Sequence, residues 1–175
     1  MAKNKFYWLE GTTKKEIEGL LNNKGFNWLR SQRNRRILVI SHALTLLLLA
    51  FGIYYQQFKK WLGDDSFVPL LSMIVVSLLA LFGYSLLRIS VRGISDAPDE
   101  LLDERQRAIR NSNYRYSYQL LGFVFIVFTL ILIVGPETRP FGLGQDGDAT
   151  FAYISFLMAA ASLPSMVMAW RERDI

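Results

Sequence analysis

Few side chains in this sequence are of a type that performs chemistry in a protein interior. The chain has no cysteine, which excludes disulfides, thiolate metal sites and cysteine nucleophiles. Its one histidine, His42, excludes metal sites built from several histidines and a haem held by two of them. His42 stands in an apolar stretch, where an ionisable side chain is a candidate for proton handling or ligand contact. The alternative is a neutral histidine that packs against a neighbouring helix and bonds to it.

A dense run of charged side chains is the segment 103–107, Asp-Glu-Arg-Gln-Arg. Neighbouring carboxylates can act as an acid/base pair, but here arginines surround them and neither a histidine nor a glycine-rich phosphate loop is near. A charged helix that serves either as a stalk or as a docking surface for a partner is the better interpretation. Its candidate docking residues are Asp103, Glu104, Arg105, Arg107 and Arg110. We therefore predict that the chain is not an enzyme and that it uses no cofactor or metal.

Four long apolar stretches would position these residues. They cover about residues 37–55, 67–87, 118–134 and 150–170, and none contains Asp, Glu, Lys or Arg. A helix needs about 20 apolar residues to cross the roughly 30 Å hydrocarbon core of a bilayer. The sequence therefore predicts an all-α integral membrane protein, a four-transmembrane-helix bundle made of two hairpins.

Lys and Arg are distributed unevenly over the segments between these stretches. The N-terminal segment holds nine, the central loop six and the C-terminal tail two, against three on the other side. By the positive-inside rule both termini and the central loop are cytoplasmic, in a plasma membrane that we take to be bacterial. The same layout explains the net charge of +5 without a nucleic-acid partner. An aromatic belt at the inner boundary is expected from Tyr114, Tyr116, Tyr118 and Trp170.

We expect a basic cytoplasmic segment over residues 1–36, followed by the transmembrane domain over residues 37–175. Thr13 and Glu16 have the spacing of a capping box and predict a short helix that runs through Leu21. The arginines and aromatic residues that follow, before the first span, suit a segment at the level of the lipid headgroups. In the central loop, Ser95 or Asp96 is expected to cap a helix that runs without a break into the third span.

The central loop also carries a resemblance. The Asp-Glu-Arg triplet at 103–105 is followed four residues later by Ile109, in a loop between two predicted hairpins. This resembles a family of small prokaryotic four-span membrane proteins of unknown function. The likeness covers the hairpin–loop–hairpin layout and a short stretch of the loop. It implies architecture only, because that family has no assigned activity.

Small residues recur along the fourth stretch at helical spacing, where they allow helices to approach closely. The candidate packing residues are Ser155, Ala159 and Ser162. We predict a non-catalytic accessory or interaction subunit of a larger membrane complex, of a respiratory or transport assembly. Its partners would be membrane lipids and protein subunits, through the spans and the cytoplasmic loop. The alternative is a small homo-oligomeric transporter or channel that uses His42.

Overall fold

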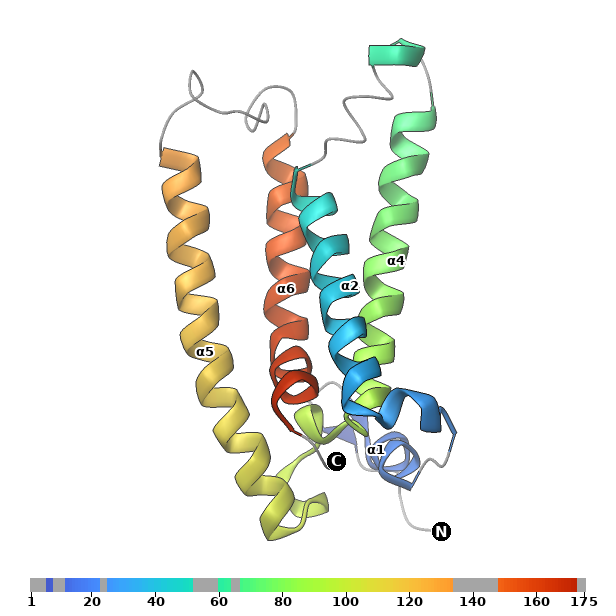
Figure 1. The fold of residues 1–175 in the computed structure, drawn as a ribbon, viewed down its shortest axis with the longest axis vertical. Helices are drawn as coiled ribbons and strands as arrows, with labels where there is room; N and C mark the ends of the chain where they lie inside the picture. The colour runs from blue at the N-terminus through green and yellow to red at the C-terminus, as the bar shows by residue number, and fades with distance from the viewer. Residues whose placement is uncertain are drawn as a thin grey trace. The chain divides into compact units, whose positions relative to one another are not determined.

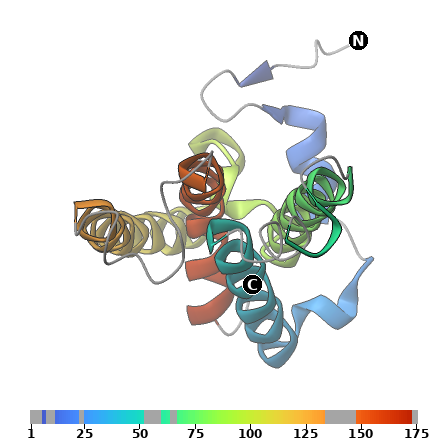
Figure 2. The same ribbon diagram turned by 90° about the horizontal axis from the view of Figure 1, so that it is seen from above.

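The computed structural model describes residues 6–7, 12–22, 25–51, 60–63, 67–133 and 148–172. Over these ranges the chain is almost entirely helical (Figure 1), which confirms the predicted helical class. The longer elements are α1 (Lys14–Asn22), α2 (Gln32–Phe51), α4 (Val68–Ser90), α5 (Glu104–Ile133) and α6 (Asp148–Arg171). Short 3₁₀ turns are η1 (Asn27–Arg30), η2 (Ile94–Asp96) and η3 (Asp99–Leu101). Two strands of two residues each, β1 (Phe6–Tyr7) and β2 (Thr12–Thr13), pair antiparallel near the N-terminus (Figure 2).

Among the described residues, two helical stretches are long and apolar enough to cross a membrane. They are Val68–Ser90, which is 23 residues long, and Tyr153–Arg171, which is 19 residues long. At 1.5 Å per residue they measure about 35 Å and about 29 Å, close to the thickness of the hydrocarbon core. Along α4, large apolar side chains are exposed in consecutive pairs rather than along one stripe. These pairs are Leu70 and Leu71, Ile74 and Val75, Leu78 and Leu79, and Leu81 and Phe82.

Side-chain caps set the start of the first two helices. The Thr13 hydroxyl accepts the backbone N–H of Glu16 at 3.3 Å, as the capping-box spacing predicts, and α1 begins at Lys14. In the same way the Ser31 hydroxyl accepts the N–H of Asn34 at 3.3 Å. Because of this cap α2 begins at Gln32. The helix thus starts five residues before the predicted span, and Arg33, Arg35 and Arg36 belong to it, whereas Arg30 lies in η1.

The predicted start of the central-loop helix is wrong. The carboxylate of Asp103 accepts the N–H of Gln106 at 2.7 Å, and the Gln106 side chain accepts the N–H of Asp103 at 3.1 Å. This reciprocal pair satisfies two free donors at the first turn, so α5 begins at Glu104. Neither Ser95 nor Asp96 caps α5. The expected continuity is confirmed, because α5 runs unbroken from Glu104 to Ile133.

The chain divides into two compact units that alternate along the sequence. Unit 1 comprises residues 1–39, 85–118 and 163–175, and unit 2 comprises residues 40–84 and 119–162. Each of α2, α4, α5 and α6 contributes one part to each unit. The same four helices thus carry both units. The expected division at residue 36 stays a prediction.

Unit 1 has an apolar core of its own. Its buried members come from α1, α2, α4, the α4–α5 connection and α6: Ile17, Val39, Leu87, Val91, Ile94, Ala97, Leu102, Met168 and Ala169. Full burial of one of the Val, Leu, Ile or Met side chains in this set stabilises the fold by about 1.5–3 kcal/mol. Gly93 brings the connection close to α1, because a Cβ at this position would lie 3.0 Å from the Leu20 side chain. The segments that the sequence predicts to be cytoplasmic therefore pack together.

Candidate functional site

The connection between α4 and α5 begins with a Schellman motif. The Gly93 N–H donates to the Arg88 carbonyl at 2.8 Å, and the Arg92 N–H donates to the Ile89 carbonyl at 3.1 Å. Arg92 occupies the left-handed position of the motif with φ of 55°, where glycine is the usual residue. The two bonds satisfy the last carbonyls of α4 and direct the chain into η2. Arg88 also forms an ion pair with Asp96 at 2.5 Å, which ties η2 back to the helix.

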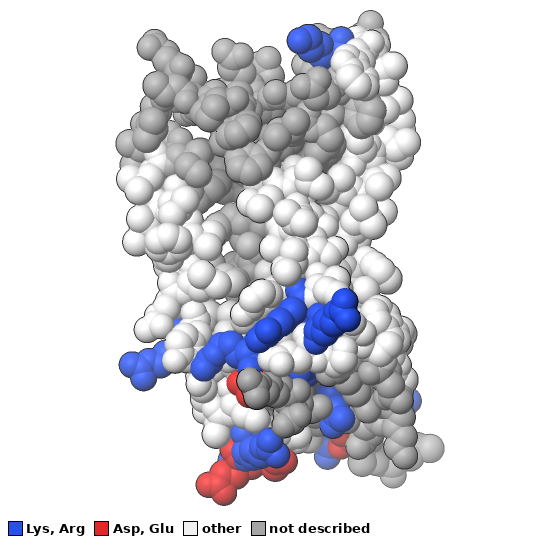
Figure 3. Space-filling model, viewed as in Figure 1, with Lys and Arg blue, Asp and Glu red and all other residues white. Residues whose placement is uncertain are grey.

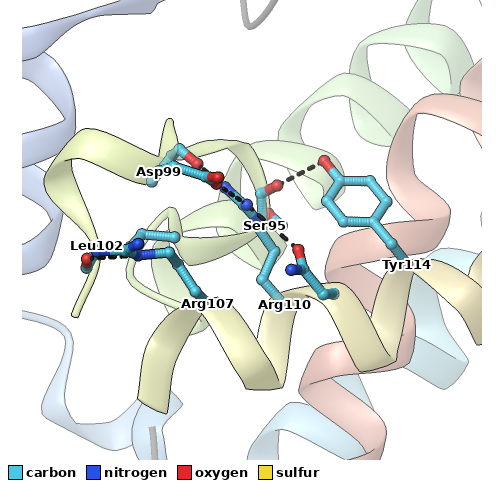
Figure 4. Close-up of polar contacts among 8 residues, drawn as sticks. Ser95, Asp99, Leu102, Arg107, Arg110 and Tyr114 are labelled. Atoms are coloured by element: carbon cyan, nitrogen blue, oxygen red, sulfur yellow. Dashed lines mark hydrogen bonds and ion pairs between the residues drawn. The ribbon is translucent and has the colours of Figure 1, made fainter. Parts of the chain in front are cut away.

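Ser95 is the centre of a buried set of hydrogen bonds in unit 1. Its hydroxyl lies 2.8 Å from that of Ser165 on α6, and both serines are 1% exposed. Its carbonyl accepts the phenol O–H of Tyr114 on α5 at 2.7 Å (Figure 4). One residue thus joins the connection to two helices, and a buried hydroxyl bonded in this way leaves no unsatisfied polar group.

Arg110 holds the connection from the side of α5. Its guanidinium donates to the Ala97 carbonyl and to the Asp99 carboxylate (Figure 4). The hydrogen bond from Arg110 and the positive charge of its side chain lower the pKa of Asp99 below the usual range. The guanidinium of Arg110 thus binds groups of unit 1 itself. Arg107, by contrast, is exposed, and its Nε donates to the Leu102 carbonyl at 3.1 Å.

The structure separates the five predicted docking residues into two groups. Arg110 is directed inward, with 12% of its side chain exposed. The other four lie exposed at the start of α5: Asp103, Glu104, Arg105 and Arg107. Of these four, Asp103 caps α5 and Arg107 donates to the Leu102 carbonyl. The side chains of Glu104 and Arg105 make no hydrogen bond or ion pair among the described residues.

A second polar network surrounds the C-terminal end of α6, and sequence reasoning missed it. Arg35 is fully buried, and its Nη2 donates to the Glu172 carbonyl at 2.6 Å. Asn113, 1% exposed, donates to the Ile109 carbonyl and to the Glu172 carboxylate, both at 2.9 Å. Its side-chain oxygen accepts a hydrogen bond from Arg171 at 3.0 Å. Cations at the end of a helix where carbonyls are free are favourable, so these contacts stabilise the last turn of α6.

The periodicity of α2 contains the signal that would have found Arg35. The buried side chains of this helix follow one another at intervals of three and four residues: Arg35, Val39, His42, Leu46 and Leu49. This is the spacing of a single helix face. The arginine lies on the same stripe as the apolar residues, whereas its neighbours Arg33 and Arg36 are exposed.

His42 lies in unit 2 and is 2% exposed. Among the described residues neither of its ring nitrogens has a hydrogen-bond partner. The backbone of α4 lies directly against the imidazole, because a Cβ built on Gly83 would come 2.7 Å from Nδ1. Only a residue without a side chain allows this approach, so Gly83 and His42 form a close-packed pair.

Two residues of the predicted small-residue stripe of α6 make hydrogen bonds within the chain. Ser155 is 5% exposed, and its hydroxyl donates to the Leu46 carbonyl of α2 at 2.6 Å. Ser162 is fully buried, and its hydroxyl donates to the Ala159 carbonyl of its own helix at 3.2 Å. Ser155 thus provides a direct hydrogen bond between two helices of unit 2.

Within the part of the chain that the structure describes, no group of three or more histidine or acidic residues is placed to hold a metal ion. No family model, curated protein or solved structure matches this chain. The resemblance of the 103–105 triplet to four-span proteins therefore stays a prediction.

Proposed function

We propose that this chain crosses a bacterial plasma membrane four times and serves as a non-catalytic accessory or interaction subunit of a larger membrane complex. Both termini and the central loop lie in the cytoplasm. The complex is of the respiratory or transport type, and the subunit contacts it through its spans and through the start of α5.

The exposed apolar surface of the helices supports the membrane location. Successive residues of a helix differ by about 100° in direction, so the exposed pairs along α4 cover a broad arc. α5 exposes a further set of large apolar side chains: Phe123, Phe125, Ile126, Val127 and Leu130. Soluble monomers rarely expose a contiguous apolar patch larger than a few hundred Å². Hydrocarbon is the solvent in which such helices are stable.

The composition of unit 1 supports the orientation. It contains the N-terminal segment, the central loop and the C-terminal tail, and these are the segments that carry most of the Lys and Arg. Segments that pack into one compact unit are expected on one side of a membrane. The positive-inside rule makes that side the cytoplasm.

The use of polar side chains is the observation that carries the role of an accessory subunit. In unit 1 several buried polar groups bond to one another and to helix ends, as the contacts of Ser95, Asn113 and Arg110 illustrate. The exposed charges Glu104 and Arg105 remain available on the first turn of a long helix. Such a surface is suited to contact a partner by charge, whereas a catalytic site needs convergent groups around a substrate.

Co-purification in mild detergent from the native host tests the role. The tagged wild-type protein is expected to retain stoichiometric partner subunits. The double exchange Glu104→Arg with Arg105→Glu preserves net charge but reverses the local pattern, and it should release the partner. The matched control Lys14→Glu with Glu18→Lys exchanges an exposed ion pair on α1 and should retain it. Recovery of a lone monomer or a homo-oligomer in several detergents would contradict the proposal.

The absence of natural cysteine makes the topology directly measurable. Single cysteines are introduced at Leu62 and Arg105, both of which are exposed. An impermeant maleimide applied to intact cells should label position 62 and leave position 105 unlabelled until the cells are permeabilised. Labelling of both positions from outside would rule out the four-span arrangement.

The alternative function is a small homo-oligomeric transporter or channel, and the state of His42 favours it. Burying an imidazole with no hydrogen-bond partner among the described residues costs free energy of folding. Ionisable residues kept in a membrane span at such a cost often belong to an ion or proton pathway. Flux in proteoliposomes, compared between the wild type and His42→Ala, decides between the two functions. Flux that is absent, or that His42→Ala leaves unchanged, removes this mechanism.

A further inference from the structure

The arginines of unit 1 differ in their contacts. Arg88 and Arg110 form ion pairs with Asp96 and Asp99. Several others are exposed and form no ion pair with any acidic side chain that the structure describes, among them Arg33, Arg36, Arg115 and Arg171. On the face shown in Figure 3, Lys and Arg side chains gather in a band, while most of the remaining described surface is uncharged. Unit 1 thus carries a layer of positive charge that its own described carboxylates do not neutralise.

Two members of this layer lie on aromatic rings. The guanidinium carbon of Arg36 is 5.2 Å from the centroid of the Trp170 ring, and that of Arg171 is 3.7 Å from the centroid of Tyr116. Trp170 and Tyr116 are themselves 42% and 49% exposed. Stacking on a ring fixes the plane of a guanidinium and leaves N–H groups at its edge free to bind an anion in a bidentate manner.

Each guanidinium also makes one hydrogen bond that holds it in place. The Nε of Arg36 donates to the Trp170 carbonyl at 3.5 Å, and the Nη1 of Arg171 donates to the side chain of Asn113 at 3.0 Å. The two arginines therefore come from α2 and α6, and the rings that support them from α6 and α5. Residues of three helices hold the positive layer in a defined geometry.

The chain changes from charged to apolar directly beside this layer. On α2, exposed Arg36 is followed by Ile37, which is 54% exposed, and on α5 Arg115 is followed by exposed Tyr118 and Leu120. An exposed apolar surface that adjoins cations and aromatic rings matches the boundary between headgroups and acyl chains. An acidic protein partner would match the cations but would leave the adjoining apolar surface in water. Lipid is therefore the better occupant.

We propose that Arg36 and Arg171, supported by Trp170 and Tyr116, form a binding site for the phosphate of an anionic phospholipid in the cytoplasmic leaflet. The acyl chains of this lipid begin at the exposed apolar side chains of Ile37 and Tyr118. Arg33 and Arg115 add to the local positive potential. This inference rests on the membrane location proposed above and names a lipid partner for unit 1.

Quenching of tryptophan fluorescence by brominated lipids tests the site. The Trp8→Phe, Trp61→Phe background retains two of the three tryptophans of unit 1, Trp28 and Trp170. The protein is reconstituted in vesicles of phosphatidylcholine that contain dibrominated phosphatidylglycerol or dibrominated phosphatidylcholine. The ratio of the two quenching constants gives the preference for the anionic lipid. An arginine near an anionic surface changes affinity by about fivefold, so Arg36→Gln with Arg171→Gln should lower the preference by about 25-fold.

Two further variants separate a defined site from general attraction. Arg105→Gln removes one exposed positive charge from the start of α5 and should leave the preference unchanged. Arg36→Lys with Arg171→Lys keeps both charges but loses the flat guanidinium, and it should give an intermediate preference.

Three outcomes would overturn the proposal. Equal quenching by the two lipids in the parent protein removes the anionic preference. A loss for Arg105→Gln as large as that for a single site arginine assigns the effect to diffuse surface potential. Release of a co-purified protein by the Gln variants, with the lipid preference unchanged, assigns the surface to an acidic protein instead. If neither lipid quenches the fluorescence and alkaline carbonate extracts the chain from membranes, the proposed membrane location itself is wrong. If the protein is inserted but shows no preference for the anionic lipid, only the proposed lipid site is wrong.

Discussion

Unit 1 and unit 2 share four helices, yet different interactions hold their described parts together. In unit 1, buried side chains such as Arg35, Ser95 and Asn113 bond to carbonyls and to other side chains from distant segments. In unit 2 the described contacts include the close approach of Gly83 to His42 and the ring contact of Phe125 with Phe156 at 5.7 Å. Unit 2 also has a hydrogen bond between helices, from Ser155 to the Leu46 carbonyl, but such bonds are more numerous among the described residues of unit 1. Packing suits a segment in hydrocarbon, and hydrogen-bond networks suit a segment that reaches water.

The largest expected effect comes from removing the arginine of the α6 network. Arg35→Met replaces the aliphatic part of the arginine by an unbranched apolar side chain but loses the hydrogen bond to the Glu172 carbonyl. We expect the free energy of unfolding to fall by about 2–3 kcal/mol. Reversible unfolding in mixed detergent micelles measures it. Arg33→Met, two residues earlier and exposed, is the matched control and should change stability little. Equal effects of the two changes would mean that burial of Arg35 contributes nothing specific.

The packing in unit 2 is tested at its closest contact. In Gly83→Ala the new methyl group lies within 3 Å of the His42 ring, so the helices must move apart at a cost of about 1–3 kcal/mol. Gly122→Ala is the control, because nothing lies within 4 Å of that position, and it should be neutral or stabilise α5 by up to about 1 kcal/mol. Combining Gly83→Ala with His42→Ala should recover much of the loss. Additive losses in the double variant would contradict direct contact.

A smaller effect is expected from one hydrogen bond of unit 1. Tyr114→Phe removes the O–H that donates to the Ser95 carbonyl and should lower the unfolding free energy by about 1 kcal/mol. Tyr118→Phe, on a ring that is 69% exposed, should leave it unchanged. If both variants melt at the wild-type temperature, the contact of Tyr114 adds no net stability.

The smallest expected effect is a pH dependence. The pKa of Asp99 is lower in the folded protein than in the unfolded chain because Arg110 binds its carboxylate. This pair therefore stabilises the fold fully above the unfolded pKa of about 4, and the contribution is lost as the pH falls through the lower folded value. The difference in melting temperature between wild type and Asp99→Asn should be small, since Asp99 is exposed, and should shrink further below about pH 4. A difference that grows toward acid would refute the assignment.

Local signals in the sequence predicted the helical class, the cap at Thr13 and the continuity of α5. Apolar length and capping spacing are properties of neighbouring residues, so they can be read from the chain alone. The start of α5 was missed because Asp103 competes with Ser95 and Asp96 as a cap, and the choice depends on Ser165 and Arg88, which engage the earlier candidates. The burial of Arg35 depends on a carbonyl 137 residues away, which no local pattern specifies.

That separation has a consequence for biosynthesis. Ribosomes add roughly 5–20 residues per second, so the guanidinium of Arg35 emerges on the order of ten seconds before the Glu172 carbonyl exists. During that interval the amino-terminal part of unit 1 lacks the closing turn of α6, with Met168 and Ala169 of its core. The buried polar and apolar contacts of unit 1 are therefore completed only after α6 has been synthesised.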